Sequence, residues 1–176
     1  CNLNMTRIGV FSGNRAEYGL LKHLIRAIDL DSNLELQLFL SGSHLSKIYG
    51  ETINEVLQDK IKPKAVIPIS IDTNPPLSMA YLTGEVITGF EKILSEFVPE
   101  LLILLGDRYE TFAAASTAHL MQIPILHIHG GETTLGAVDD KLRHAISQLS
   151  SWHFASAPPY KEKLISMGIE KSRIFE

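Results

Sequence analysis

The sequence predicts an α/β fold, a three-layer α/β/α arrangement in which helices cover both faces of a parallel β-sheet. Strand-like and helix-like segments alternate along the whole chain, which is the pattern of consecutive β-α-β units. The strand-like segments are continuous apolar runs, as is typical of strands buried on both faces. A chain of 176 residues fits one domain with a substantial core, which we place at residues 6–176.

In the first half of the chain, apolar runs predict the strands, and apolar residues recurring every three or four positions predict the helices. The predicted strands are residues 7–12, 34–40 and 65–69. The predicted helices cover residues 20–28, 51–58 and 77–97. The segment 72–76 cannot continue a regular element, because it contains two adjacent prolines. The long helix is expected to end before Pro99, since the residue preceding a proline disfavours helical geometry.

The second half of the chain repeats the alternation. The predicted strands are residues 101–105, 123–128 and 153–156. The predicted helices are residues 109–121, 139–149 and 158–167, and Gly168 closes the last of them. Residues 173–176 begin a further strand that has no partner downstream. We therefore expect the chain to be part of a longer protein.

Composition excludes several classes of protein. The formal net charge is −4 and no basic run is present, which argues against nucleic-acid binding. The apolar runs are far shorter than the ~20 residues that a membrane helix needs, and no secretory signal precedes the first strand. The single cysteine, Cys1, excludes an internal disulfide framework and fits a reducing compartment. We expect a cytoplasmic protein.

Ionisable residues follow two of the predicted strands, and this indicates a functional site. Asp107 and Arg108 come directly after Gly106 at the end of strand 101–105, and His129 and Glu132 follow strand 123–128. In open α/β sheets, ligands bind outside the carboxyl ends of the strands. Asp107 could instead cap the next helix, because aspartate is a favoured N-cap residue. Glu132 is well placed for acid–base work.

The loop 13–19 also follows a strand and opens a helix, where free backbone N–H groups could bind an anion. It is neither a dinucleotide fingerprint nor a Walker loop, because it lacks the required glycines and the Lys-Ser/Thr pair. Arg15 could bind a phosphate or carboxylate there. The alternative is an ordinary turn with a solvated arginine.

Two histidines and a charged helix start complete the candidate site. His127 and His129 share one face of a strand and could form a metal site with neighbouring acids. We favour instead a hydrogen-bonded His127 beneath the end of the sheet. The spacing of Asp139 to Arg143 and of Asp140 to His144 allows both pairs to meet across one helical turn. The alternative is a capped helix start with a solvated ion pair.

Five motifs in fixed order carry a resemblance to a known family. They are Gly13-Asn-Arg-Ala-Glu-Tyr, Ser41-Gly-Ser-His-Leu, Gly106-Asp-Arg-Tyr-Glu, His127-Ile-His-Gly-Gly-Glu and Asp139-Asp-x-x-Arg-His. With these motifs the chain resembles the hydrolysing UDP-N-acetylglucosamine 2-epimerases, in the branch that feeds sialic-acid-type sugar synthesis. The resemblance covers residues 6–176.

The resemblance implies two Rossmann-like domains that face each other across a cleft, as in GT-B glycosyltransferases, with this chain as the N-terminal domain. It implies conversion of UDP-GlcNAc to UDP and N-acetylmannosamine by anti elimination to a 2-acetamidoglucal, followed by hydration. It also implies that no metal, nicotinamide or other cofactor is used and that the full-length protein is a homo-oligomer, a dimer or tetramer. We expect this chain alone to fold but to be inactive.

The resemblance also assigns roles to individual residues. Asp107 and Asp139 are the main catalytic candidates. Arg15 and Arg108 would bind the nucleotide or its phosphates, and His44 would line the cleft. The remaining residues expected to bind substrate are Asp140, Arg143 and His144.

One position departs from the pattern of the family. His129 stands where many members have a catalytic glutamate, so acid–base work falls either to His129 or to Glu132. This departure leaves the substrate open, since relatives also act on UDP-2,4-diacetamido-trideoxy sugars of legionaminic-type pathways. Two other classes remain as rivals, a GT-B glycosyltransferase domain and a non-catalytic module that binds sugar nucleotides.

Overall fold

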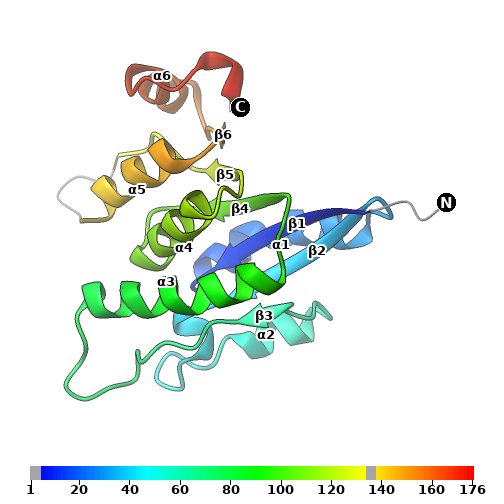
Figure 1. The fold of residues 1–176 in the computed structure, drawn as a ribbon, viewed down its shortest axis with the longest axis vertical. Coiled ribbons are helices and arrows are strands. Elements are labelled where there is room, and N and C mark those ends of the chain that lie inside the picture. Colours follow the sequence, from blue (N-terminus) through cyan, green and yellow to red (C-terminus); the bar gives the residue numbers. More distant parts are fainter. Residues whose placement is uncertain (1–4, 134–137) are drawn as a thin grey trace.

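A computed structural model describes residues 5–133 and 138–176, and its centre is a seven-stranded sheet (Figure 1). The strands are β1 (Thr6–Ser12), β2 (Leu34–Leu40), β3 (Ala65–Val66), β4 (Leu101–Leu105), β5 (Ile125–Ile128), β6 (Trp152–Phe154) and β7 (Ile174–Phe175). Their order in the sheet is β3-β2-β1-β4-β5-β6-β7, and every neighbouring pair is parallel. The predicted parallel α/β sheet is confirmed.

In the described residues, six α-helices and two short 3-10 turns connect the strands. The helices are α1 (Arg15–Leu30), α2 (Ile53–Gln58), α3 (Met79–Glu96), α4 (Tyr109–Leu120), α5 (Val138–Leu149) and α6 (Pro158–Ser166), and the 3-10 turns are η1 (Gly42–Leu45) and η2 (Lys171–Arg173). Helices α3, α4 and α5 lie in a row on one side of the sheet, and α1 lies behind it (Figure 1).

Each face of the sheet has its own hydrophobic core. The first core joins Phe11 and Phe39 of the sheet to Phe90 of α3 and to the alanines of α4. The short alanine side chains let α4 pack closely against the sheet and against both neighbouring helices. The second core, on the opposite face, joins the strands to Leu21 and Ile25 of α1. This division confirms the predicted three layers.

Strands β3 and β5 are both shorter than predicted, and a proline explains each of these differences. Strand β3 ends at Val66 rather than at residue 69, because Pro68 has no N–H with which to continue the ladder. Strand β5 begins at Ile125 rather than at residue 123, since Pro124 contributes only its carbonyl, to the Leu102 N–H at 2.9 Å. The strand predicted from residue 173 is confirmed as β7, which pairs with β6 at the edge of the sheet.

The order of the strands brings three loops together. The chain runs from β1 to β2 in one direction along the sheet and from β4 to β5 in the other, so the order reverses between β1 and β4. Such a reversal leaves a crevice at the carboxyl ends of the strands. The loops that follow β1, β4 and β5 therefore lie side by side. None of the described helices is long and apolar enough to cross a membrane.

His127 fastens β5 to the loop after β4. Its side chain is fully buried, its Nε2 lies 2.8 Å from the Gly106 carbonyl oxygen, and its Nδ1 lies 3.0 Å from the Ser147 hydroxyl of α5. This contact network favours the hydrogen-bonded alternative for His127 over the metal-binding one. Burial lowers the pKa of His127 to about 3, although the Gly106 hydrogen bond acts in the opposite direction.

We predict that His127 makes the fold sensitive to acid. The native pKa of about 3 lies below the ordinary value of 6.5, so the unfolded chain binds a proton that the native chain excludes. The stabilisation is present above pH 6.5 and is lost as the pH falls below it. In urea titrations between pH 7 and pH 5, the His127→Gln variant should lose less stability than the parent, by up to ~1.4 kcal/mol per pH unit. Equal slopes in the two proteins would contradict this prediction.

Candidate active site

A hollow of about 360 Å³ opens where the three loops meet. Its lining comes from the loops after β1, β4 and β5 and from the first turns of α1 and α5. The lining residues are Asn14, Ala16, Glu17, Leu20, Leu105, Gly106, Asp107, Arg108, His129, Glu132, Asp139 and Arg143. The structure therefore brings all four predicted catalytic residues to one hollow, together with two of the predicted substrate-binding arginines.

Arg143 is the central side chain of this hollow. Its side chain is only 8% exposed, and its Nη2 contacts the Asp107 carboxylate. Its Nη1 donates to the His129 carbonyl oxygen at 2.9 Å and to Glu132 Oε2 at 3.2 Å. The helical spacing allowed a pair between Arg143 and Asp139. Among the ion pairs of the described residues, Arg143 pairs instead with Asp107 and Glu132, which lie on two other loops. One guanidinium fixes the loop after β4 to the loop after β5.

Glu132 accepts hydrogen bonds from two donors and lies beside the His129 ring. Besides Arg143, the Ser156 hydroxyl donates to its Oε1 at 2.6 Å, and His129 Nδ1 lies 3.2 Å from the same oxygen. A carboxylate fixed in this way can orient the neighbouring imidazole ring through its Nδ1 edge. The side chain of His129 remains 34% exposed at the hollow, so its other nitrogen, Nε2, is the one available to a ligand.

The backbone around His129 has an unusual conformation. The φ angle of His129 is +66°, a left-handed value that costs energy for any residue other than glycine. The two glycines that follow have a packing role: a Cβ atom on Gly130 would lie 2.8 Å from Ser147 Oγ, and one on Gly131 would lie 2.3 Å from the Tyr160 carbonyl oxygen. The Gly-Gly pair therefore allows the loop to pack against α5 and α6, and it leaves His129 at the hollow.

Two buried acids near the hollow were not singled out in the sequence. Asn14, the N-cap of α1, accepts the Glu17 N–H at 3.0 Å, and Glu17 accepts the N–H of the preceding residue, Gly13, at 2.7 Å, an arrangement close to a capping box. Burial, opposed by the Gly13 hydrogen bond, raises the pKa of Glu17 to about 7. Glu110 is fully buried and pairs with Arg108. Both acids belong to the sequence motifs given above. The position of Glu17, three residues after Asn14 at the start of a helix, could have indicated its capping role.

The structure places two of the predicted binding residues outside this hollow, and it decides one alternative for Asp107. His44 does not line the hollow: it is fully buried, with Nε2 2.9 Å from the Ser12 hydroxyl and Nδ1 2.9 Å from the Thr52 hydroxyl. Burial lowers the pKa of His44 to about 4. Arg15 points away to an exposed ion pair with Glu55 at 2.9 Å and does not line the described hollow. Asp107 does not cap α4, since the N-cap residue is Arg108.

The other pair predicted on α5 does form. His144 Nε2 lies 3.6 Å from the Asp140 carboxylate, and neither residue is among the described side chains that line the hollow. In the part of the chain that the structure describes, no three His, Cys, Asp or Glu side chains gather as metal ligands would.

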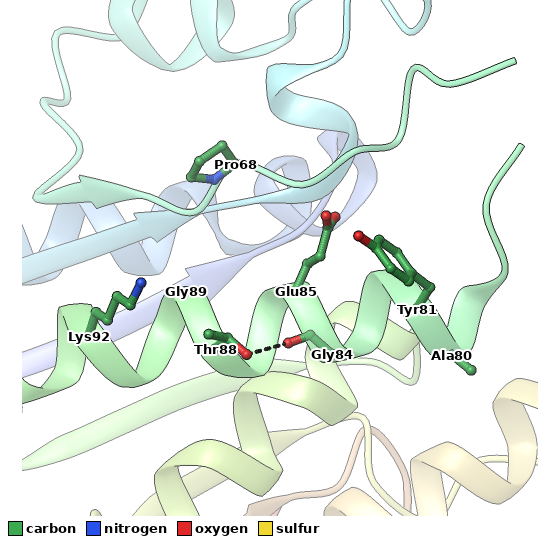
Figure 2. Close-up of a pocket in the computed structure, with 8 residues that line it drawn as sticks. All are labelled: Pro68, Ala80, Tyr81, Gly84, Glu85, Thr88, Gly89 and Lys92. Carbon is green, nitrogen blue, oxygen red and sulfur yellow. Dashed lines mark hydrogen bonds between the residues drawn. The ribbon is translucent and has the colours of Figure 1, made fainter.

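A second hollow, of about 570 Å³, runs along α3 (Figure 2). Tyr81, Glu85 and Lys92 lie along one side of that helix, and Pro68 faces them across the groove (Figure 2). The Glu85 carboxylate accepts both the N–H and the hydroxyl of Ser70, at 2.7 and 2.8 Å. Glu85 therefore holds the segment that follows β3 in place. The predicted catalytic residues line the first hollow and not this groove.

Comparison with known proteins identifies relatives over nearly the whole chain. The UDP-N-acetylglucosamine 2-epimerase family profile matches residues 26–176. A UDP-N,N'-diacetylbacillosamine 2-epimerase (hydrolysing) from Legionella pneumophila is 37% identical over 94% of this chain and 44% of its own length. A UDP-N-acetylglucosamine 2-epimerase from Neisseria meningitidis serogroup B is 34% identical over 97% of this chain and 44% of its own length.

A solved structure agrees with these relatives. The crystal structure of a Neisseria meningitidis UDP-GlcNAc 2-epimerase bound to UDP-GlcNAc superposes with a TM-score of 0.83 and 26% identity, over 97% of this chain and 45% of that chain. The chain thus spans less than half the length of the curated relatives it matches.

We predict that Arg143 is a major determinant of stability. The Arg143→Met variant leaves Asp107 and Glu132 without their shared cation, and breaking a buried pair in this way costs about 3 kcal/mol. Urea unfolding at pH 7 measures this loss.

The matched control for Arg143 is Arg173→Met. It removes an exposed arginine whose partner, Glu170, lies 3.6 Å away, and an exposed pair contributes at most about 1 kcal/mol. Equal losses in the two variants would show that Arg143 does not hold the loops together.

Proposed function

Since the chain belongs to the UDP-N-acetylglucosamine 2-epimerase family, we propose that it provides the acid–base wall of a hydrolysing UDP-sugar 2-epimerase. The observation that carries this proposal is the convergence of Asp107, His129, Glu132 and Asp139 on one hollow that also contains Arg108. Removing a weakly acidic C–H proton and later hydrating a double bond both require several positioned acid–base groups.

The proposed reaction converts UDP-GlcNAc and water to N-acetylmannosamine and UDP. In the first step a base takes the proton from C2, the C1–O bond to UDP breaks, and a 2-acetamidoglucal forms. In the second step water supplies a hydroxyl to C1 and a proton is delivered to C2 with inverted configuration. The first step places one further negative charge on the departing diphosphate, so a cation near it lowers the barrier.

The contacts in the hollow suggest a division of roles. Asp107, oriented by Arg143, is proposed as the base that takes the C2 proton. His129 and Asp139 line the same hollow and are proposed to exchange the protons of the hydration step. Glu132 accepts hydrogen bonds from Arg143 and Ser156, and His129 Nδ1 lies 3.2 Å from it, so we propose that it orients His129 and that His129 replaces the glutamate of many family members. Arg108 is proposed to contact the diphosphate.

A second substrate is a specific alternative. The relative named for UDP-N,N'-diacetylbacillosamine is 37% identical to this chain, against 34% for the relative named for UDP-N-acetylglucosamine. A UDP-2,4-diacetamido-trideoxy sugar is therefore the alternative substrate, and it would place the enzyme in a legionaminic-type rather than a sialic-acid-type pathway. The match to the epimerase family supports both substrates over a glycosyltransferase or a non-catalytic module.

We propose further properties of the whole protein. The relatives are more than twice as long as the matched region, which supports a second, nucleotide-binding domain that closes the cleft in a GT-B-type arrangement. The nucleotide-sugar substrate and the single cysteine support a cytoplasmic location. A homo-oligomer, dimer or tetramer, is proposed for the full-length protein, and sedimentation equilibrium measures its size.

Turnover by the full-length protein tests the proposed function. With UDP-GlcNAc we expect release of UDP and N-acetylmannosamine and, in deuterated water, one deuterium at C2 of the product. The Asp107→Asn and His129→Gln variants should each lower kcat by roughly 10²–10⁴, the usual contribution of a general acid or base. His119→Gln, an exposed histidine at the far end of α4, is the matched control and should keep full activity.

Each contrary result is informative. Turnover of the diacetamido sugar alone would select the second substrate, and no release of UDP from either sugar would reject an epimerase. Undiminished turnover by Asp107→Asn would remove that residue from the mechanism.

We also predict that residues 1–176 alone fold but do not turn over. The acid–base residues are present, but the region corresponding to the other half of the relatives is not. Circular dichroism should show a cooperative unfolding transition, while UDP release stays at the background rate. Robust UDP release by the isolated chain would overturn this prediction.

A further inference from the structure

Glu110 is a buried acid whose only ion-pair partner among the described residues is Arg108. Its carboxylate accepts Arg108 Nε at 3.1 Å through Oε2 and Arg108 Nη2 at 3.2 Å through Oε1. This is the two-pronged geometry in which a carboxylate fixes the plane of a guanidinium. The side chain of Glu110 is 0% exposed, whereas that of Arg108 is 45% exposed at the hollow. The acid therefore lies behind the arginine and away from any ligand.

Two glycines from other loops make room for this carboxylate. A Cβ atom on Gly13, after β1, would lie 3.0 Å from Glu110 Cβ. A Cβ atom on Gly42, after β2, would lie 2.9 Å from Glu110 Oε1 and 2.4 Å from the Gly13 carbonyl oxygen. Gly42 also has a φ of +59°. These two adjacent loops thus form a socket that receives one carboxylate of α4 and excludes larger residues.

The ring of Tyr109 supports the arginine from another side. The Arg108 guanidinium carbon lies 5.9 Å from the centroid of the ring, and Tyr109 itself is buried. Of the two arginines that line the described hollow, Arg143 is occupied by Asp107 and Glu132. Arg108 has its Nε and Nη2 on Glu110, and in the part of the chain described here its Nη1 has no hydrogen-bond partner. That edge is available to an anion.

We propose that Glu110 is a positioning residue, which holds Arg108 in the orientation that binds the diphosphate of the substrate. This inference rests on the proposed function and extends it to a residue outside the hollow. A long arginine side chain that is free in solution samples many rotamers, and the ion pair removes that freedom before the ligand arrives. The ion pair leaves Arg108 able to bind an anion, because a guanidinium group has five N–H donors and Glu110 uses two of them.

Calorimetric binding of UDP to the full-length protein tests the inference without requiring turnover. Glu110→Gln keeps the shape of the side chain but removes its charge, and it should weaken UDP binding about tenfold. Binding of uridine, which has no phosphate, should stay unchanged. A merely structural defect would weaken both ligands equally. Glu100→Gln is the matched control: it breaks an exposed contact with Arg7, 3.7 Å long, at the opposite end of the strands and should leave both affinities unchanged.

The double variant decides whether Glu110 acts through Arg108. If it does, Arg108→Met with Glu110→Gln should bind UDP no more weakly than Arg108→Met alone. An additional tenfold loss in the double variant, or unchanged UDP affinity in Glu110→Gln, would overturn the inference. If Glu110→Gln does not fold, Arg108→Lys provides the second test, because lysine keeps the charge but cannot make the two-pronged contact.

Arg108→Lys should therefore weaken UDP binding about tenfold as well, and full affinity would overturn the inference. Absence of UDP binding by the unsubstituted protein would reject the proposed function and this inference with it. UDP binding that is normal in every variant would reject this inference alone.

Discussion

The ion pairs of Arg143 are the interaction on which the rest of the candidate site depends. A guanidinium that is 8% exposed joins Asp107, Glu132 and the His129 carbonyl group, which come from two different loops. Neither carboxylate could stay so close to the other without a cation between them. The same contacts determine which way His129 faces, because its backbone carbonyl and the carboxylate beside its ring are both held by Arg143. The sheet brings the loops together, and this one side chain gives them a defined geometry.

The fold was largely predictable because its signals are local. Short apolar runs predicted the strands, and apolar residues at helical spacing predicted the helices. The alternation of the two predicted a parallel sheet. The errors in the lengths of β3 and β5 have one cause: Pro68 and Pro124 lie within apolar runs, and hydrophobicity outweighed the missing N–H in the prediction. The convergence of the loops after β4 and β5 was predictable as well, since parallel strands end at one edge of the sheet.

The sequence predicted some site residues and missed others, because the burial of a side chain and its hydrogen-bond partners depend on residues that are distant along the chain. His44 and His129 both follow strands, yet one is enclosed between Ser12 and Thr52 and the other faces the hollow. Arg15 and Arg108 both follow a glycine turn, but only Arg108 has a buried acid behind it. Glu17 and Glu110 were missed for the same reason. Their importance comes from contacts with loops that are distant in sequence, and a motif read along the chain does not show such contacts.

The left-handed backbone of His129 has a consequence for how this position can evolve. Glycine would relieve the strain at a φ of +66° and would be the residue favoured by folding alone, yet it would remove the imidazole ring. The proposed acid–base role of His129 therefore sets stability against chemistry at this one position. Selection for a more heat-resistant protein, without selection for turnover, should replace this histidine early. Libraries screened for both traits should keep a residue with a functional group at the same position.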